Sequence, residues 1–401
     1  MTNEIEKVKG FRDILPPESL KRTKVKSVIE ENFRLFGFIP IETPTIEYDS
    51  LLRGDNESDE AVSDRFRLQD KGKRELGLRF EFTVQLSRIF KENSTIKLPF
   101  RRYQIGNNFR DEPLRQDRYR EFIQCDADIL GDATINADAE CLALGSKILK
   151  DLGIKAEIKV NNRKLLNSML EKIGIESSQQ QQVLREIDKL DKLGEKEVKI
   201  NLSKVLMEKQ IKELFLLLGK DLDYFVKQKF NGVNEIYDLQ KLGKTYDYKI
   251  VFTPTLMRGF SYYTGNVWEI FSKEKKVALA SGGRYDDKVG KYCNRQIPAV
   301  GISFGTLVDY DKVEVESVKY VLISLEQDKL TIDLASKLRN SGKSCVVFYG
   351  KPSKALDWAN AYGAENVIFI GAEEVKKKKF KVKNLKSGKE IFIGEKELIG
   401  K

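Results

Sequence analysis

The stretch RGFSYYTGNVWE, residues 258–269, carries more information about this chain than any other segment. It places Arg258 beside the paired tyrosines Tyr262 and Tyr263, followed by a turn glycine and a short β-prone run that ends on an acid. Arginine is a permanent planar cation that binds phosphate oxygens in pairs. The segment therefore suits a site that holds a small polar molecule against a phosphate. Taken alone, it also fits an edge strand with surface aromatic residues.

The composition is that of a globular protein with more than one domain. The chain has 401 residues, of which 33% are charged and 41% apolar. A formal charge of +10 suits a polyanionic partner such as nucleic acid, although solvated lysine faces are common. The amino terminus lacks the apolar core of a signal peptide, and no apolar run approaches the roughly 20 residues that span a bilayer. We therefore expect a cytoplasmic protein without a membrane segment.

The content of reactive side chains limits which catalytic mechanisms are possible. The chain contains no histidine, so serine–histidine and cysteine–histidine hydrolase mechanisms are excluded. Its four cysteines are scattered without a Cys-x-x-Cys pair, so neither a zinc site nor a disulfide framework is predicted. Any catalysis must depend on carboxylates, arginines, tyrosines or a bound ion.

The first 160 residues alternate between helical and β-prone segments. Apolar spacing predicts a helix over 19–36, and a proline-containing edge strand follows over 38–44. Between 76 and 130, short strands are expected to alternate with charged loops. Residues 133–152 are expected to form a helix that packs on the sheet.

The end of this region, residues 122–130, shows a period of two. Gln124, Asp126 and Asp128 share one face of the predicted strand, and apolar residues share the other. A half-solvated antiparallel strand gives the same pattern. Two acids and a glutamine on one face favour a strand that lines a cavity.

The rest of the chain divides into two regions of different character. Residues 163–245 are rich in lysine and glutamate with helical spacing, which predicts a helical insertion. After residue 310, strands alternate with helices, which predicts a compact α/β domain. Lysines crowd residues 376–389, where a solvated hairpin and an RNA-facing surface are equally good interpretations.

Arginines flank a predicted turn between residues 100 and 122. Arg110 and Glu112 end one strand, and Arg118 and Phe122 begin the next. Facing strands that carry arginines supply positive charge to a phosphate undergoing in-line attack. An aromatic ring such as Phe122 stacks on a flat base.

Several of these motifs resemble those of one family. The segment 258–269 and the later segments SGGRYD (281–286) and PAVG (298–301) resemble two signatures of histidyl-tRNA synthetases, in the right order. The segment around Arg110 and Phe122 resembles motif 2 of class II aminoacyl-tRNA synthetases, and the resemblance extends over nearly the whole chain.

This resemblance implies an α+β fold. A class II synthetase-type antiparallel catalytic sheet (1–162 and 246–312) is interrupted by the helical insertion (163–245), and a C-terminal α/β anticodon-binding domain (318–401) follows. It implies ATP-dependent ligation of L-histidine to tRNA(His) through histidyl-adenylate, with Mg²⁺ bound with ATP, by a cytoplasmic homodimer.

The resemblance also assigns roles to residues by position. Arg258 and Arg110 are the catalytic cations on the α-phosphate. The residues expected to bind histidine are Glu81, Thr83, Gln124, Asp128, Tyr262, Tyr263 and Tyr285. The residues expected to bind ATP are Arg110, Glu112, Arg118, Phe122 and Arg258. Protein ligands for a metal are not predicted.

Three positions depart from the family pattern. Ser261 stands where the first signature usually carries an aspartate. Asp128 occupies a place that glutamate often fills. Val308 stands where motif 3 normally ends in the arginine that holds the γ-phosphate, so other groups must hold the ATP tail.

Two alternative functions compete with the enzyme. One is a non-catalytic synthetase-like regulatory subunit of ATP phosphoribosyltransferase in histidine biosynthesis. Such paralogues usually lack the anticodon domain and the catalytic arginines, whereas this chain has Arg110, Arg258 and a domain after residue 318. The other is a free-standing RNA-binding or sensor module that uses the pocket to detect an amino acid.

Overall fold

The computed structural model describes residues 5–54, 60–114, 118–257, 262–275, 277–305, 313, 315 and 317–400. The chain divides into two compact units, one formed by residues 1–12 and 26–309 and the other by residues 13–25 and 310–401. Within the described residues, no helix is long and apolar enough to cross a membrane.

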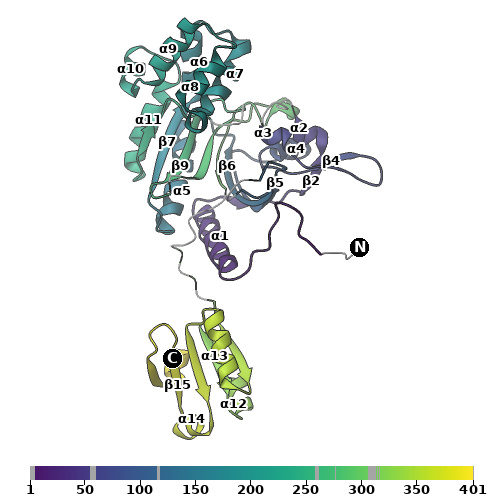
Figure 1. Ribbon diagram of the computed structural model, residues 1–401, viewed down its shortest axis with the longest axis vertical. Coiled ribbons are helices and arrows are strands. Elements are labelled where there is room, and N and C mark those ends of the chain that lie inside the picture. Colours follow the sequence, from purple (N-terminus) through teal and green to yellow (C-terminus); the bar gives the residue numbers. More distant parts are fainter. Residues whose placement is uncertain are drawn as a thin grey trace. The chain divides into compact units, whose positions relative to one another are not determined.

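An eight-stranded, mainly antiparallel sheet forms the centre of the first unit (Figure 1). Its strands, in spatial order, are β1 (Ile39–Pro40), β5 (Phe100–Phe109), β6 (Glu121–Leu130), β11 (Ala299–Phe304), β10 (Ala278–Arg284), β9 (Asn266–Ser272), β7 (Ala156–Asn162) and β8 (Ile250–Phe252). Only the two outer pairs, β1 with β5 and β7 with β8, are parallel. The prolines near β1 therefore lie at an edge, as predicted.

Helices and a small sheet flank this sheet. Helix α5 (Ile135–Asp151) packs on β11, and the second half of α1 (Glu18–Leu35) buries Phe33 against Tyr103. The smaller elements are β2 (Ile46–Tyr48), α2 (Asp49–Arg53), α3 (Glu60–Ser63), β3 (Arg67–Gln69), β4 (Glu75–Leu78), α4 (Val84–Glu92) and the 3₁₀ turn η1 (Lys291–Cys293). Strands β2, β4 and β3 form a separate sheet.

One expectation for residues 76–130 needs correction. Helix α4 (Val84–Glu92) lies where only strands and loops were predicted. Strand β6 is buried on both faces through most of its length, and its polar residues line a cavity, the interpretation favoured over a half-solvated strand. Polar and apolar residues still alternate along β6, because the polar side chains face an enclosed site instead of water.

The predicted insertion is entirely helical. It consists of α6 (Arg163–Lys172), α7 (Ser177–Asp188), α8 (Leu190–Leu202), α9 (Glu208–Leu218), α10 (Leu222–Lys227) and α11 (Val233–Thr245). The first five lie together as one group (Figure 1), and they share an apolar core with the start of α11. Helix α11 also packs on α5 and β7 of the main sheet.

The second unit contains a five-stranded mixed sheet. Its spatial order is β13 (Cys345–Tyr349), β12 (Tyr320–Ser324), β14 (Asn366–Ile370), β15 (Lys379–Asn384) and β16 (Glu390–Gly394), with the first three parallel. Its helices are α12 (Asp328–Asn340), α13 (Pro352–Ala361), α14 (Ala372–Lys377) and α15 (Glu395–Ile399). The predicted strand–helix alternation is confirmed, and the lysine-rich segment forms the β15–β16 hairpin.

Leu338→Ala should destabilise the second unit by about 2–5 kcal/mol, because the Leu338 side chain is fully buried and its removal leaves a cavity. Ile332→Ala on the same helix is the control, since Ile332 is 54% exposed and its truncation should cost under about 0.5 kcal/mol. Chemical denaturation of the full chain measures both. Equal effects would contradict this assignment of the core.

Candidate active site

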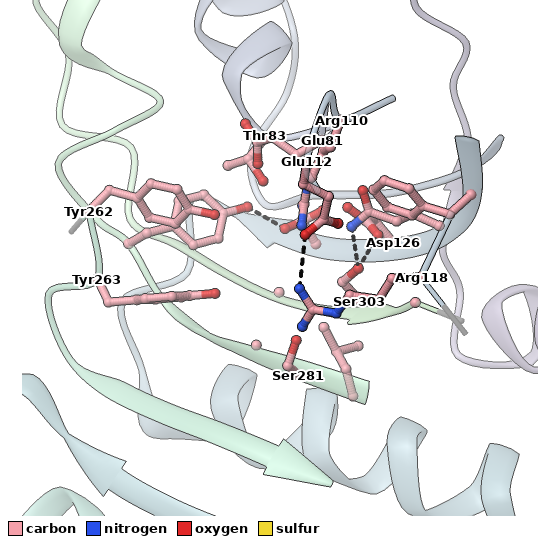
Figure 2. A pocket seen from close by; sticks show the side chains of 18 of the residues that line it. Glu81, Thr83, Arg110, Glu112, Arg118, Asp126, Tyr262, Tyr263, Ser281 and Ser303 are labelled. Carbon is pink, nitrogen blue, oxygen red and sulfur yellow. Dashed lines mark hydrogen bonds and ion pairs between the residues drawn. The ribbon is translucent and has the colours of Figure 1, made fainter. Parts of the chain in front are cut away.

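A cavity of about 270 Å³ lies among strands β6, β10 and β11 of the main sheet. Figure 2 shows side chains that converge on it from separate parts of the chain, including Glu81, Arg118, Tyr262 and Ser303. Its lining residues are Glu81, Thr83, Arg110, Glu112, Arg118, Tyr119, Phe122, Gln124, Asp126, Asp128, Tyr262, Tyr263, Ser281, Gly282, Tyr285, Gly301, Ile302, Ser303 and Gly305.

The structure brings the predicted site residues together. The residues expected at both the amino-acid end and the ATP end line this one cavity, apart from Arg258. Arg258, Ser261 and Val308 lie outside the described residues. Arg284, from the same signature as Tyr285, does not line the cavity.

Four polar residues of the lining were not predicted from the sequence as site residues: Tyr119, Asp126, Ser281 and Ser303. Asp126 carried a usable signal, because it shares the polar face of β6 with Gln124 and Asp128. The sequence holds no such signal for Ser303, because Ser303 lies beside Asp126 only through the pairing of β11 with β6.

A buried ion pair forms the floor of the cavity. The fully buried Arg102, on β5, contacts Oδ2 of Asp128 through its terminal nitrogen at 2.6 Å. The other carboxylate oxygen, Oδ1, accepts a hydrogen bond from the hydroxyl of Tyr285. Burial raises the pKa of Asp128, and Arg102 opposes that rise by stabilising the charged form.

Glycines of the second signature make room for this floor. A Cβ at Gly301 would overlap the carboxylate of Asp128, and a Cβ at Gly282 would overlap the carbonyl of Gly301. The close approach of β10, β11 and the Asp128 side chain therefore requires glycine at both positions. This gives a packing reason for two residues that the motif alone could not explain.

A second group of polar residues forms a chain of hydrogen bonds along one wall. Asn108 donates to Gln124 Oε1 at 2.5 Å, and Gln124 Nε2 donates to Ser303 Oγ at 2.9 Å. Ser303 in turn donates to Asp126 Oδ1 at 2.5 Å. Burial raises the pKa of Asp126 to about 7, against the opposing effect of Arg102.

Two arginines also line the cavity. Arg110 is held by the carbonyl oxygen of Phe80, at 3.2–3.3 Å, and its guanidinium lies 4.9 Å from the ring centroid of Phe122. Arg118 pairs with Glu112 at 2.9 Å, which Figure 2 shows as a dashed line. Arg110 is thus fixed by its surroundings, whereas the side chain of Arg118 is 53% exposed and is held by Glu112.

Glu81 and the tyrosines occupy the remaining sides. The Glu81 carboxylate accepts a hydrogen bond from the backbone N–H of Val84 at 2.7 Å, which ties it to the start of α4. The rings of Tyr262, Tyr263 and Tyr285 pack together, with centroids 4.9 and 5.7 Å from that of Tyr262. Acidic, aromatic and arginine side chains therefore line one cavity together.

Arg284 holds the scaffold behind the cavity. Its guanidinium donates to Asp138 on α5, and also to the backbone oxygens of Asp132 and Thr134 at 2.9–3.0 Å. Asn266 on β9 donates to the other oxygen of Asp138 at 3.1 Å. This network fixes the backbone immediately before Tyr285, so Arg284 acts through structure rather than through contact with a ligand.

The same network reaches the helical insertion. Asn162, at the end of β7, donates to Asn266 Oδ1 at 2.8 Å and to Glu235 of α11 at 2.7 Å. Lys164 of α6 pairs with the other oxygen of Glu235 at 2.6 Å. A continuous polar path thus joins the insertion to the strand that precedes Tyr285.

Comparisons with known proteins agree with this geometry. Residues 10–307 match the family model described as histidyl-tRNA synthetase. Histidine–tRNA ligase 1 of Bacillus cereus is 35% identical over 97% of both chains. This chain belongs to the histidyl-tRNA synthetase family. A histidine–tRNA ligase of Helicobacter pylori is 34% identical, with 98% of this chain and 97% of the relative aligned.

Solved structures confirm the predicted fold class. The histidyl-tRNA synthetase of Nostoc sp. PCC 7120 superposes with a TM-score of 0.87 at 25% identity, covering 98% of both chains. A Bacillus halodurans protein described as an ATP phosphoribosyltransferase regulatory subunit/histidyl-tRNA synthetase superposes at 0.77 with 23% identity. It covers 92% of this chain and shares its fold. The antiparallel core, the helical insertion and the C-terminal α/β domain are thus features of a known architecture.

Arg102→Met should destabilise this synthetase-family chain by about 3–5 kcal/mol, because Asp128 would remain buried without its cation. Arg101→Met is the matched control: its partner Glu140 is partly exposed, so its loss should cost about 1 kcal/mol or less. Urea denaturation near neutral pH measures both variants. Similar losses for the two would contradict the assigned role of Arg102.

Asp126→Asn should change the pH dependence of stability. Because the folded pKa of Asp126 is raised to about 7, the native state binds more protons than the unfolded state between about pH 4 and pH 7. Wild-type stability therefore falls as pH rises through that window, by up to about 1.4 kcal/mol per pH unit. Relative to wild type, the variant should gain stability from about pH 5 to 7 and no more above it. Denaturation at each pH tests this, and a constant difference would contradict it.

Proposed function

We propose that this chain is a histidine–tRNA ligase, which uses ATP to join L-histidine to tRNA(His) through histidyl-adenylate and releases AMP and diphosphate. The supporting observation is that one cavity combines acidic side chains and tyrosines with the arginines Arg110 and Arg118. Membership of the histidyl-tRNA synthetase family, over nearly the whole chain, agrees with that chemistry.

The reaction requires positioning rather than a protein nucleophile. The carboxylate of histidine attacks the α-phosphorus of ATP, a new oxygen–phosphorus bond forms, and diphosphate leaves. A hydroxyl of the tRNA terminus then attacks the carbonyl carbon of the adenylate, and AMP leaves. Negative charge accumulates at phosphorus in the first step, so a fixed cation such as Arg110 lowers its barrier. Arg258, by its family position, is the second such cation.

Acidic and polar groups recognise the amino acid in this proposal. Glu81, Thr83 and Gln124 supply acceptors for the α-ammonium group, and Glu81 is oriented by its bond to the start of α4. Tyr285 and Asp128 face the imidazole with Tyr263 and Tyr262 beside them. An amino acid without ring nitrogens would leave these buried polar groups unpaired, which is a strong basis for rejection.

In this proposal, ATP binds beside the two arginines of the cavity. Arg110 and Arg118 contact phosphate oxygens, Phe122 supports the base, and Glu112 releases Arg118 as the phosphates enter. A cluster of three or more acidic, cysteine or histidine side chains that could hold a metal alone is not found among the described residues. Mg²⁺ would therefore enter with the phosphates, with Glu112 the nearest acid. With Val308 at the end of motif 3, Arg118 is the best candidate to hold the ATP tail.

The remaining proposals concern partners. The lysine-rich hairpin of β15 and β16 gives the C-terminal domain a cationic surface that suits the anticodon region of tRNA(His). A cytoplasmic homodimer, with the segment around β1 at its interface, follows from the family.

A regulatory subunit of ATP phosphoribosyltransferase is the alternative, and the fold shared with the Bacillus halodurans protein favours it. The fixed Arg110 in the cavity and the presence of a C-terminal α/β domain favour the ligase instead. An assay of histidine activation distinguishes the ligase from the regulatory subunit.

Histidine-dependent exchange of pyrophosphate into ATP tests the proposal directly. Wild type should catalyse exchange with histidine alone among the amino acids. Arg110→Ala and Arg258→Ala should each lower the rate by about a hundredfold or more, since each removes a cation from the α-phosphate. Asp247→Asn, at an exposed carboxylate, is the control and should retain wild-type activity. Histidine binding without exchange in wild type would instead favour the regulatory subunit.

A further inference from the structure

The hydrogen-bond chain from Asn108 to Asp126 has a defined direction. An ionised carboxylate only accepts hydrogen bonds, so Ser303 must donate to Asp126. The lone pair that remains on Ser303 Oγ then faces Gln124, and Gln124 must present its Nε2 there. This fixes Gln124 Oε1 toward Asn108. The charge on Asp126 thus determines the orientation of an amide two residues away.

We propose that Asp126 is a proton-controlled positioning residue for histidine recognition, and that its carboxylate acts through Ser303 to set the orientation of the Gln124 amide in the amino-acid pocket. The inference rests on the proposed function, which places Gln124 against the α-ammonium group of histidine. It adds a residue and a pH dependence that the histidine-binding set does not include.

When Asp126 is protonated, the hydrogen bonds from Asn108 to Asp126 can take a second arrangement. A protonated Asp126 donates a hydrogen bond, so Ser303 can accept from it and donate toward Gln124 instead. If the amides of Gln124 and Asn108 both turn, Gln124 Nε2 donates to Asn108 Oδ1. That oxygen is buried and has no hydrogen-bond partner within the described part of the chain. The turned state pairs this oxygen and places the amide nitrogen of Asn108, which donates to Gln124 in the ionised state, at the unpaired position instead.

The surroundings of Asp126 allow both states near neutral pH. The side chain is buried, and the charged groups that face it are Arg102 from β5, Asp128 from β6 and Glu81 from the segment before α4. Burial and the two acids raise its pKa, whereas Arg102 and the hydrogen bond from Ser303 lower it, with a result of about 7. Deprotonation both fixes the amide and adds negative charge near the α-ammonium group of the substrate. Both effects strengthen histidine binding as pH rises.

The absence of histidine from the chain makes this testable. Protein imidazoles do not contribute any titration near neutral pH, because the chain has none. The imidazole of the substrate titrates with a pKa of about 6.5, but it does so identically for every variant. The ratio of wild-type to variant KM for histidine therefore isolates the contribution of Asp126.

The experiment measures KM for histidine in pyrophosphate exchange from about pH 5.5 to 8.5. The variants are Asp126→Asn, Ser303→Ala and the exposed control Asp247→Asn. The wild-type KM should fall by about tenfold relative to Asp126→Asn as pH rises through about 7, the size expected for one charge-assisted hydrogen bond. Ser303→Ala should lose most of this dependence while it keeps the carboxylate. KM for ATP should not follow the same profile.

Each outcome decides the proposal. A constant ratio of wild-type to Asp126→Asn KM across the range would overturn it. A full wild-type profile in Ser303→Ala would show that the carboxylate acts through space, which would overturn the relay. If Asp126→Asn does not fold, Ser303→Ala decides by itself. If wild type catalyses no exchange at any pH, the ligase proposal fails, and calorimetric titration with histidine across the same pH range tests the relay separately.

Discussion

The buried ion pair between Arg102 and Asp128 is the constraint on which the active site depends. A carboxylate at the bottom of a cavity loses its hydration, and only a close cation and hydrogen-bond donors keep it charged. Arg102 supplies that charge from β5, and Tyr285 supplies a donor from the end of β10. The pairing of β5, β6, β11 and β10 is therefore what holds Asp128 in place at the bottom of the cavity.

A second network connects this site with the rest of the first unit. Arg284 and Asp138 hold β10 to α5, and Asn266 and Asn162 extend the contacts to Glu235 in the insertion. Buried polar groups that satisfy one another in this way specify a single arrangement of their elements. The helical insertion is consequently tied to the strand before Tyr285 by side chains and not only by the chain connections.

The sequence alone supported much of the fold and most of the candidate site. The alternation in 122–130 predicted that Gln124, Asp126 and Asp128 share a face, because a strand has a period of two whatever surrounds it. Helix α4 was missed because it is only nine residues long, which leaves little helical spacing to detect. Arg102 was not recognised as a site residue because its sequence neighbours Arg101 and Tyr103 gave no sign of which arginine is buried.

By itself, the sequence determined the order of elements, the helical insertion, the α/β character of the second unit and the chemical types gathered at the site. These follow from local periodicity and from motifs that lie within a few residues of one another. Only the tertiary structure decided that Arg102 lies under Asp128, that Ser303 meets Asp126, and that Arg284 serves the scaffold rather than the ligand. Each of these depends on strand register and burial, which join residues up to 177 positions apart and so leave no local trace.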